Sequence, residues 1–202
     1  MRRILSIILL LFTALAFSQS DKDSLLQKDF NEVYDKLKLM HYLERAAMEY
    51  YSITDEGRII SEKTFPYYLK KNVISTNPVP SIDILKYLGI YLNKDIPCNW
   101  NDFVMAVNNA NAKSLLEITE KYGYPSNPRI AKLSGLESTS TCIVFTIRKN
   151  KYAQDIEKMI KKEYKKGVIS ESEYNIFKAL NGREALSTKE VQELTKNLKK
   201  AP

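Results

Sequence analysis

The chain has 202 residues, of which 44% are hydrophobic and 27% charged, and it carries a formal net charge of +7 at pH 7. These values fit a globular chain that can bury a proper core and argue against a disordered one. With one histidine and no closely spaced cysteine pair, we expect no metal site, and the absence of a Gly-rich phosphate loop leads us to expect no cofactor.

Residues 1–18 have the pattern of a cleaved secretory signal. Two arginines precede an uncharged apolar run from Ile4 to Ala16, and the segment ends at Ser18, with Ala16 two positions earlier. The run is shorter than the roughly 20 residues that span a bilayer, which favours cleavage over an uncleaved anchor. We therefore expect an exported, periplasmic or secreted protein that forms a single domain over 19–202 and has no transmembrane segment.

The basic residues are concentrated near the C-terminus. Residues 148–202 hold 14 Lys plus Arg against 8 Asp plus Glu, whereas residues 19–147 hold 15 against 16. A basic surface attracts anions, and outside the cytoplasm an anionic envelope component or an acidic protein is a more plausible partner than nucleic acid. The other interpretation is a solvated helix face with no partner.

Two cysteines, Cys98 and Cys142, are the only candidates for a disulfide. An oxidising compartment permits the bridge, and closing so long a loop would stabilise the fold by about 4 kcal/mol in the chain-entropy treatment. Two separate buried thiols are the alternative, because the required Cα approach cannot be read from a sequence.

Apolar residues recur at three- and four-residue spacing from Asp21 to Tyr51, which predicts one long amphipathic helix. Arg58–Ile60 fits a short strand or an extended connection, and Phe65–Ile74 fits helix or strand. Ser81 is expected to cap a helix over Ile82–Leu92.

Two further helices, Trp100–Val107 and Ala112–Tyr122, are expected on either side of the asparagine-rich run 108–111. Thr139–Ile147 is rich in β-branched and aromatic residues and is the best strand candidate; it needs a partner from Arg58–Ile60 or Phe65–Ile74. The predicted fold class is therefore α+β, predominantly helical with a small β-sheet or hairpin.

The C-terminal part is predicted to be helical. Tyr152–Lys166 is amphipathic and ends at Gly167, Ser170 with Glu173 forms a capping box, and Ser187 with Glu190 forms a second one. Clear start signals on successive helices indicate an ordered end rather than a basic tail.

The run Lys121-Tyr122-Gly123-Tyr124-Pro125 predicts a helix corner. Gly123 suits a left-handed residue after the helix, and Pro125 prevents its continuation. Two tyrosines on a rigid corner are also candidates for ligand contact.

This corner, within Asn109–Arg129, together with Ile160–Ser170 and Leu180–Arg183, resembles an uncharacterised bacterial domain family that is frequent in exported proteins of the Bacteroidetes type. In that family pattern a strand ends in histidines. Here Ile147, Arg148 and Lys149 occupy those places, and Ala179 and Leu180 replace a further histidine. The resemblance therefore implies a shared scaffold without the family's histidines.

From these residues we expect a non-catalytic binding or interaction protein that uses a surface near Tyr122, Tyr124, Arg148 and Arg183. The alternative is a hydrolase of a cell-envelope or extracellular polymer. In that case His41, the single histidine, or a carboxylate such as Glu44 or Glu49 would act as the base. A packing role for His41 at the border of the first helix's apolar stripe is the simpler interpretation.

We predict that exported material begins at Gln19, because the small-residue cleavage site lies directly before it. Intact-mass and N-terminal analysis of the exported protein would measure this. A product that retains residues 1–18 would contradict the prediction.

Overall fold

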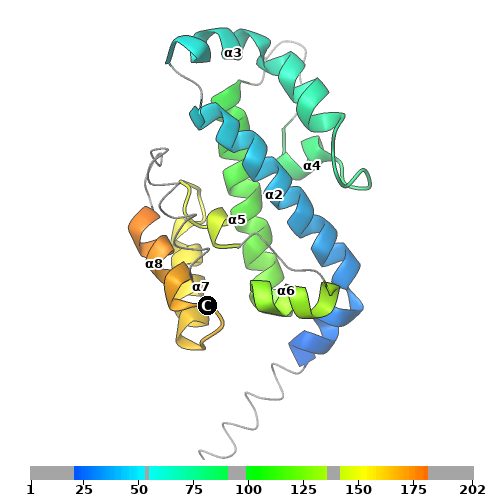
Figure 1. The fold of residues 1–202 in the computed structure, drawn as a ribbon, viewed down its shortest axis with the longest axis vertical. Coiled ribbons are helices and arrows are strands. Elements are labelled where there is room, and N and C mark those ends of the chain that lie inside the picture. Colours follow the sequence, from blue (N-terminus) through cyan, green and yellow to red (C-terminus); the bar gives the residue numbers. More distant parts are fainter. Residues whose placement is uncertain (1–20, 53–54, 91–98, 136–141, 182–202) are drawn as a thin grey trace, which may run out of the picture.

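The computed structural model describes residues 21–52, 55–90, 99–135 and 142–181, and in these ranges the protein is all helical. The expectation of an α+β fold is wrong, because no strand or sheet occurs among these residues. The molecule is elongated, with α3 at one end and α6, α7 and α8 toward the other (Figure 1).

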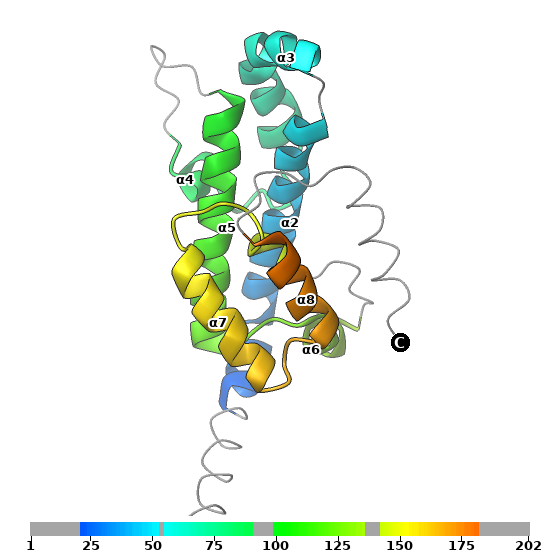
Figure 2. The same cartoon turned by 90° about the vertical axis from the view of Figure 1, so that its left-hand side faces the viewer.

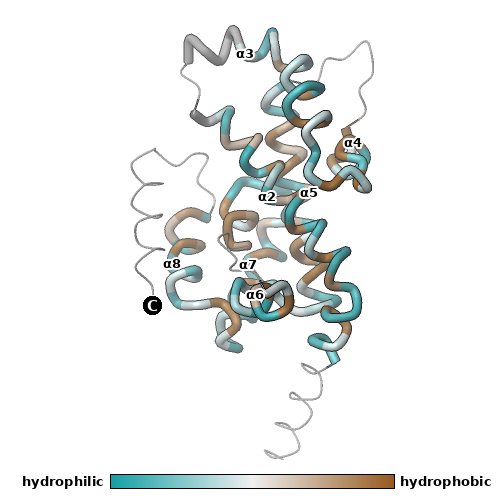
Figure 3. The backbone as a smooth tube through the Cα atoms, turned by 45° about the vertical axis from the view of Figure 1, so that its right-hand side comes forward, coloured by the Kyte–Doolittle hydropathy of each residue, from teal (hydrophilic) through white to brown (hydrophobic). Residues whose placement is uncertain are grey.

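Two long helices form the frame: α2 (Phe30–Ser52) and α5 (Trp100–Tyr122), each of 23 residues. They run antiparallel, since Lys36 Nζ meets Glu117 Oε2 at 3.3 Å near one end while the rings of Tyr50 and Trp100 stack at 5.6 Å near the other. Residues 21–28 are helical too and lead into α2, so the predicted helix from Asp21 to Tyr51 is confirmed apart from a turn at Asp29. Along α2 and α5, hydrophobic and hydrophilic residues alternate (Figure 3), as expected for helices that are buried on one side.

One hydrophobic cluster lies toward the α3 end of the frame. It joins α2 and α5 to α3 (Asp55–Tyr68), the π-helical turn η1 (Leu69–Ile74) and the short α4 (Ile84–Leu88). Its centre is aromatic: the ring centroid of Trp100 lies 4.5 Å from that of Phe65 and 4.7 Å from that of Tyr68. Asp83 rather than the predicted Ser81 caps α4, and its carboxylate accepts hydrogen bonds from two backbone N–H groups.

A second hydrophobic cluster fills the other half. It joins α2 and α5 to α6 (Asn127–Ser134), the 3-10 turn η2 (Cys142–Phe145), α7 (Ala153–Lys165) and α8 (Glu171–Leu180). In Figure 2, α7 and α8 lie in front of the lower half of the frame. Their tyrosines Tyr164 and Tyr174 stack at 4.1 Å. The predicted capping box of Ser170 and Glu173 is confirmed, whereas Ser187 and Glu190 lie outside the described residues.

The predicted strand Thr139–Ile147 is wrong over its described part. Cys142–Phe145 is a 3-10 turn, and its proposed partners Arg58–Ile60 and Phe65–Ile74 are helical. Without a partner strand, extended backbone here would leave buried N–H and C=O groups unpaired. The turn pairs some of them locally, since the Thr146 N–H donates to the Ile143 carbonyl at 3.0 Å.

The corner after α5 forms where the sequence predicts it. Gly123 has φ +80° and ψ 162°, a positive-φ conformation that favours glycine but lies outside the left-handed helical region expected. A Cβ on Gly123 would lie 2.9 Å from Arg129 Nη1. The Arg129 guanidinium also reaches the Tyr124 carbonyl and pairs with Asp23, so the bare glycine lets the arginine bind the corner to the first helical turn.

We predict that Gly123→Val lowers the free energy of unfolding by at least about 1–3 kcal/mol, the usual penalty for a non-glycine residue in such a backbone conformation. The clash with Arg129 adds to it. Denaturant midpoints measure the loss, and repeating the substitution in an Arg129→Ala background separates the clash from the backbone strain. An unchanged midpoint for Gly123→Val would show that the corner does not need glycine.

Candidate functional site

A layer of polar side chains on α5 separates the two hydrophobic clusters. Asn111 is fully buried, and its Nδ2 donates to the Met40 carbonyl of α2 at 3.1 Å. The Tyr87 hydroxyl of α4 reaches Asn111 Oδ1 at 3.0 Å and Ser114 Oγ at 3.2 Å. The layer therefore ties α2 and α4 to one position on α5, midway along the frame.

A groove of about 620 Å3 opens beside this layer. Its floor is α5, one wall is residues 86–90 at the end of α4, and the other wall is Lys151 and Tyr152, just before α7. The lining residues on the floor are Asp102, Met105, Ala106, Asn109, Ala110 and Lys113. The groove thus takes its walls from the two ends of the molecule, the kind of junction at which ligand sites are often found.

Asparagines of α5 also fix the second wall. Asn109 Oδ1 accepts a hydrogen bond from the Lys151 backbone N–H at 2.8 Å, and Asn108 Nδ2 donates to the Lys149 carbonyl at 3.3 Å. Asn150 then turns the chain into α7, because its Oδ1 accepts from the Tyr152 N–H at 2.8 Å. Both walls are therefore hydrogen-bonded to the floor helix, and the groove is preformed.

The charge of the lining is mainly positive. Among the described lining residues, Lys86, Lys113 and Lys151 are cationic and Asp102 is the only carboxylate. Lys113 Nζ lies 3.6 Å from Glu117 Oε1, but Glu117 also pairs with Lys36 at 3.3 Å. One carboxylate shared by two exposed ammonium groups neutralises neither fully.

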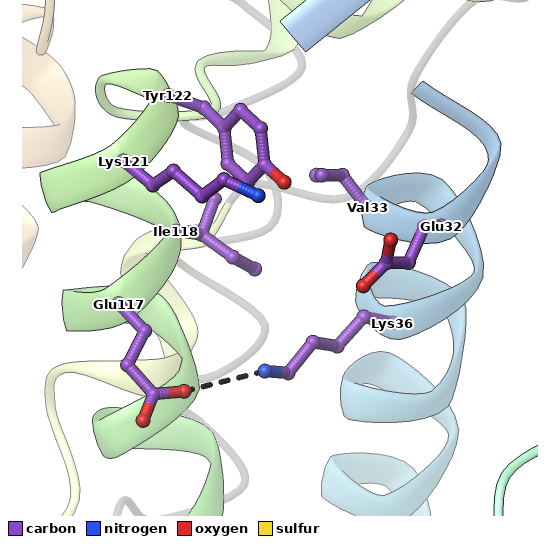
Figure 4. Close-up of a pocket in the computed structure, with 7 residues that line it drawn as sticks. All are labelled: Glu32, Val33, Lys36, Glu117, Ile118, Lys121 and Tyr122. Carbon is purple, nitrogen blue, oxygen red and sulfur yellow. Dashed lines mark hydrogen bonds and ion pairs between the residues drawn. The ribbon is translucent and has the colours of Figure 1, made fainter. Parts of the chain in front are cut away.

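Tyr122, one of the sequence-predicted binding residues, lies in a different and smaller cavity of about 190 Å3 between α2 and α5 (Figure 4). Its hydroxyl donates to Asp29 Oδ2 at 2.8 Å, and Lys121 Nζ reaches the same oxygen at 3.1 Å. These hydrogen bonds hold the pKa of Asp29 below its usual range. Tyr122, at the end of α5, therefore acts as a clasp to Asp29 in the turn that leads into α2.

Tyr124 is 1% exposed and belongs to the hydrophobic cluster near α8. Among the described residues its hydroxyl has no hydrogen-bond partner, and burial raises its pKa well above the usual value. No described cavity reaches it, so Tyr124 packs the core rather than presenting a ligand contact.

Cys142 lies beside it, buried and free, with its thiol donating to the Pro125 carbonyl at 3.5 Å. Burial raises the pKa of the thiol to about 12. Cys142 is the only cysteine in the described part of the chain, which therefore contains no disulfide. Cys98 lies outside the described residues, and its pairing with Cys142 stays a prediction.

Arg148 is buried against α2, away from both tyrosines. Its Nε lies 3.6 Å from Glu44 Oε1, and its Nη2 contacts Met48 Sδ, one helical turn further along. Burial raises the pKa of Glu44, although the charge of Arg148 opposes this shift. Arg148 thus holds the segment after η2 on α2. Tyr122, Tyr124 and Arg148 therefore lie in different surroundings, whereas Arg183 lies outside the described residues and its role stays a prediction.

His41 is one turn before Glu44 on the same helix and packs on Phe145, with ring centroids 4.6 Å apart. Burial lowers the pKa of His41 to about 4. Neither described cavity is lined by His41, Glu44 or Glu49. These contacts support the packing interpretation and give no support to a catalytic base at these positions.

The sequence interpretation missed the groove because its residues come from three separate segments. One signal is present in the sequence. The asparagine run 108–111, which is predicted to separate two helices, lies within α5. Asparagine is a poor helix former. Three asparagines kept in mid-helix therefore indicate side chains engaged in tertiary hydrogen bonds.

We predict that His41 makes stability pH-dependent. The unfolded histidine takes up a proton near pH 6.5 and the folded one only near pH 4, so stability is fully present above pH 6.5 and declines as the pH falls toward 4. His41→Gln should flatten this part of the profile. Chemical denaturation of both proteins across this range measures the difference. Parallel profiles would contradict the shift.

Comparisons with known proteins do not assign the chain: no family model matches it, and neither the curated proteins nor the solved structures contain a significant match. Within the described ranges, no helix has the length and apolar character needed to cross a bilayer, and no group of three acidic, histidine or cysteine side chains is arranged to hold a metal ion. The resemblance to an exported Bacteroidetes-type family stays a prediction.

Proposed function

We propose that this is an exported, non-catalytic binding protein that takes a small ligand in the groove between α4, α5 and the start of α7. The observation that carries the proposal is the groove itself: about 620 Å3, with both walls hydrogen-bonded to its floor. Ligand sites commonly have volumes of about 300–1,000 Å3 and are largely preformed. The proposed export rests on the secretory-signal pattern of residues 1–18.

The composition of the lining supports binding rather than hydrolysis. Asp102 is exposed, and it is the only carboxylate among the described lining residues. A hydrolytic site for polysaccharides ordinarily uses two carboxyl groups that flank the bond to be broken. Apolar floor residues such as Ala106, the Asn109 amide and lysines at the rim instead offer contact area, hydrogen bonds and charge.

We predict that Ala106→Trp prevents ligand binding, because an indole on the floor would fill the groove. Amide chemical shifts recorded with a mixture of small aromatic and sugar fragments should change at residues 86–90, 105–110 and 151–152 in the wild type and not in the variant. Ala179→Trp is the matched control, since Ala179 is exposed on α8 and does not line the groove.

Unchanged denaturation midpoints of both variants would establish that the fold is intact. Shift changes that cluster elsewhere, or that survive in Ala106→Trp, would overturn the proposed site.

A further inference from the structure

We propose that the groove selects organic anions: ligands with a ring-bearing body and a carboxylate or phosphate group. This inference rests on the proposed function, because it names the ligand class of the same groove. It is carried by three lysines that line the groove from three segments, α4, α5 and the turn before α7, beside the apolar side chains of Met105, Ala106 and Ala110.

The three lysines belong to the three parts of the groove. Lys86 is on α4, Lys113 is on α5, and Lys151 precedes α7. All three side chains are exposed, so their ammonium groups can turn toward a ligand. The basic residues of the lining therefore come from three segments of the chain rather than from one helix face.

The groups between the lysines suit a ring rather than a bare ion. Tyr87 and Tyr152 line the groove from different segments, and Met105, Ala106 and Ala110 contribute apolar side chains to its α5 lining. Lys151 Nζ lies 5.2 Å from the ring centroid of Tyr152, so an aromatic face and a cation are presented together. A sugar or aromatic ring can lie on these surfaces while its anionic group reaches a lysine.

The wall positions are fixed independently of the lysine side chains. Tyr87 is anchored through its hydroxyl to Asn111 and Ser114, and Lys151 through its backbone N–H to Asn109. Replacing the lysine ammonium groups therefore removes charge and leaves these anchors in place. A change in ligand binding after these replacements can therefore be attributed to the loss of charge rather than to movement of the walls.

The probes are 4-methylumbelliferyl β-D-glucuronide and 4-methylumbelliferyl β-D-glucoside, which differ only in a carboxylate that replaces a hydroxymethyl group. Calorimetric titration should give affinity for the glucuronide at least about tenfold higher than for the glucoside, the usual scale for hydrogen bonds to a charged group. Raising the salt concentration to about 0.5 M should reduce this preference, since screening weakens exposed charge pairs. 4-Methylumbelliferyl phosphate distinguishes a phosphate-selective groove from a carboxylate-selective one.

The triple variant Lys86→Gln, Lys113→Gln, Lys151→Gln should lose the preference and bind both glycosides equally. The matched control removes the same charge from Lys162, Lys165 and Lys178, which are exposed on α7 and α8 and do not line the groove, and should retain the preference. If both triple variants lost the preference for the glucuronide equally, the overall positive charge of the protein rather than the groove lysines would be its cause. That result would overturn the inference.

The remaining outcomes separate the two proposals. If the wild type binds both glycosides equally and Ala106→Trp abolishes both, the groove is a binding site and the anion preference is wrong. If neither the glycosides nor the phosphate bind, the anion inference is wrong. The fragment titration with Ala106→Trp then shows separately whether the groove binds small ligands at all. Release of fluorescent 4-methylumbelliferone would identify a hydrolase and overturn the non-catalytic proposal.

Discussion

The antiparallel pairing of α2 with α5 is the interaction on which the rest of the structure depends. The elements α4, α7 and η2 pack on α5, α8 packs on α7 and η2, and each hydrophobic cluster draws residues from both long helices. At the middle of the pair the buried Asn111 donates to a helix carbonyl at Met40. A buried amide has few alternative partners in an apolar surrounding, so this bond fixes the register of the two helices more strictly than leucine contacts could.

The same polar layer explains why a groove lies where it does. Hydrophobic packing closes the space on either side of the layer, but side chains that must satisfy hydrogen bonds leave the junction less completely filled. The α4 wall belongs to one cluster and the Tyr152 wall to the other, and both are tied to α5 by asparagine or tyrosine. The groove thus lies where two small cores join on one pair of helices, and the proposed ligand site needs no separate domain.

Local signals predicted the helices well and the contacts between them poorly. The Ser170–Glu173 box, the corner at Gly123 and the amphipathic spacing from Asp21 to Tyr51 act within a few residues, and each was found from the sequence. The Cys142–Phe145 segment was mistaken for a strand because Ile143 and Val144 favour extended structure, and only burial among helices with no partner strand decides against it. Arg148 is predicted to lie near a binding surface, yet its partners Glu44 and Met48 lie about 100 positions earlier in the chain.

The contacts that join the start of the described chain and α2 to α5 also constrain how the chain can fold. Asp29 and Tyr122 are 93 positions apart, and Met40 and Asn111 are 71 apart. Contacts this distant require a long loop to close before either core gains its stabilisation, which slows folding relative to a bundle of neighbouring helices. Until α5 has been synthesised, the apolar side of α2 has no partner to cover it. The first half of the chain is therefore the part most exposed to aggregation while the protein is being synthesised.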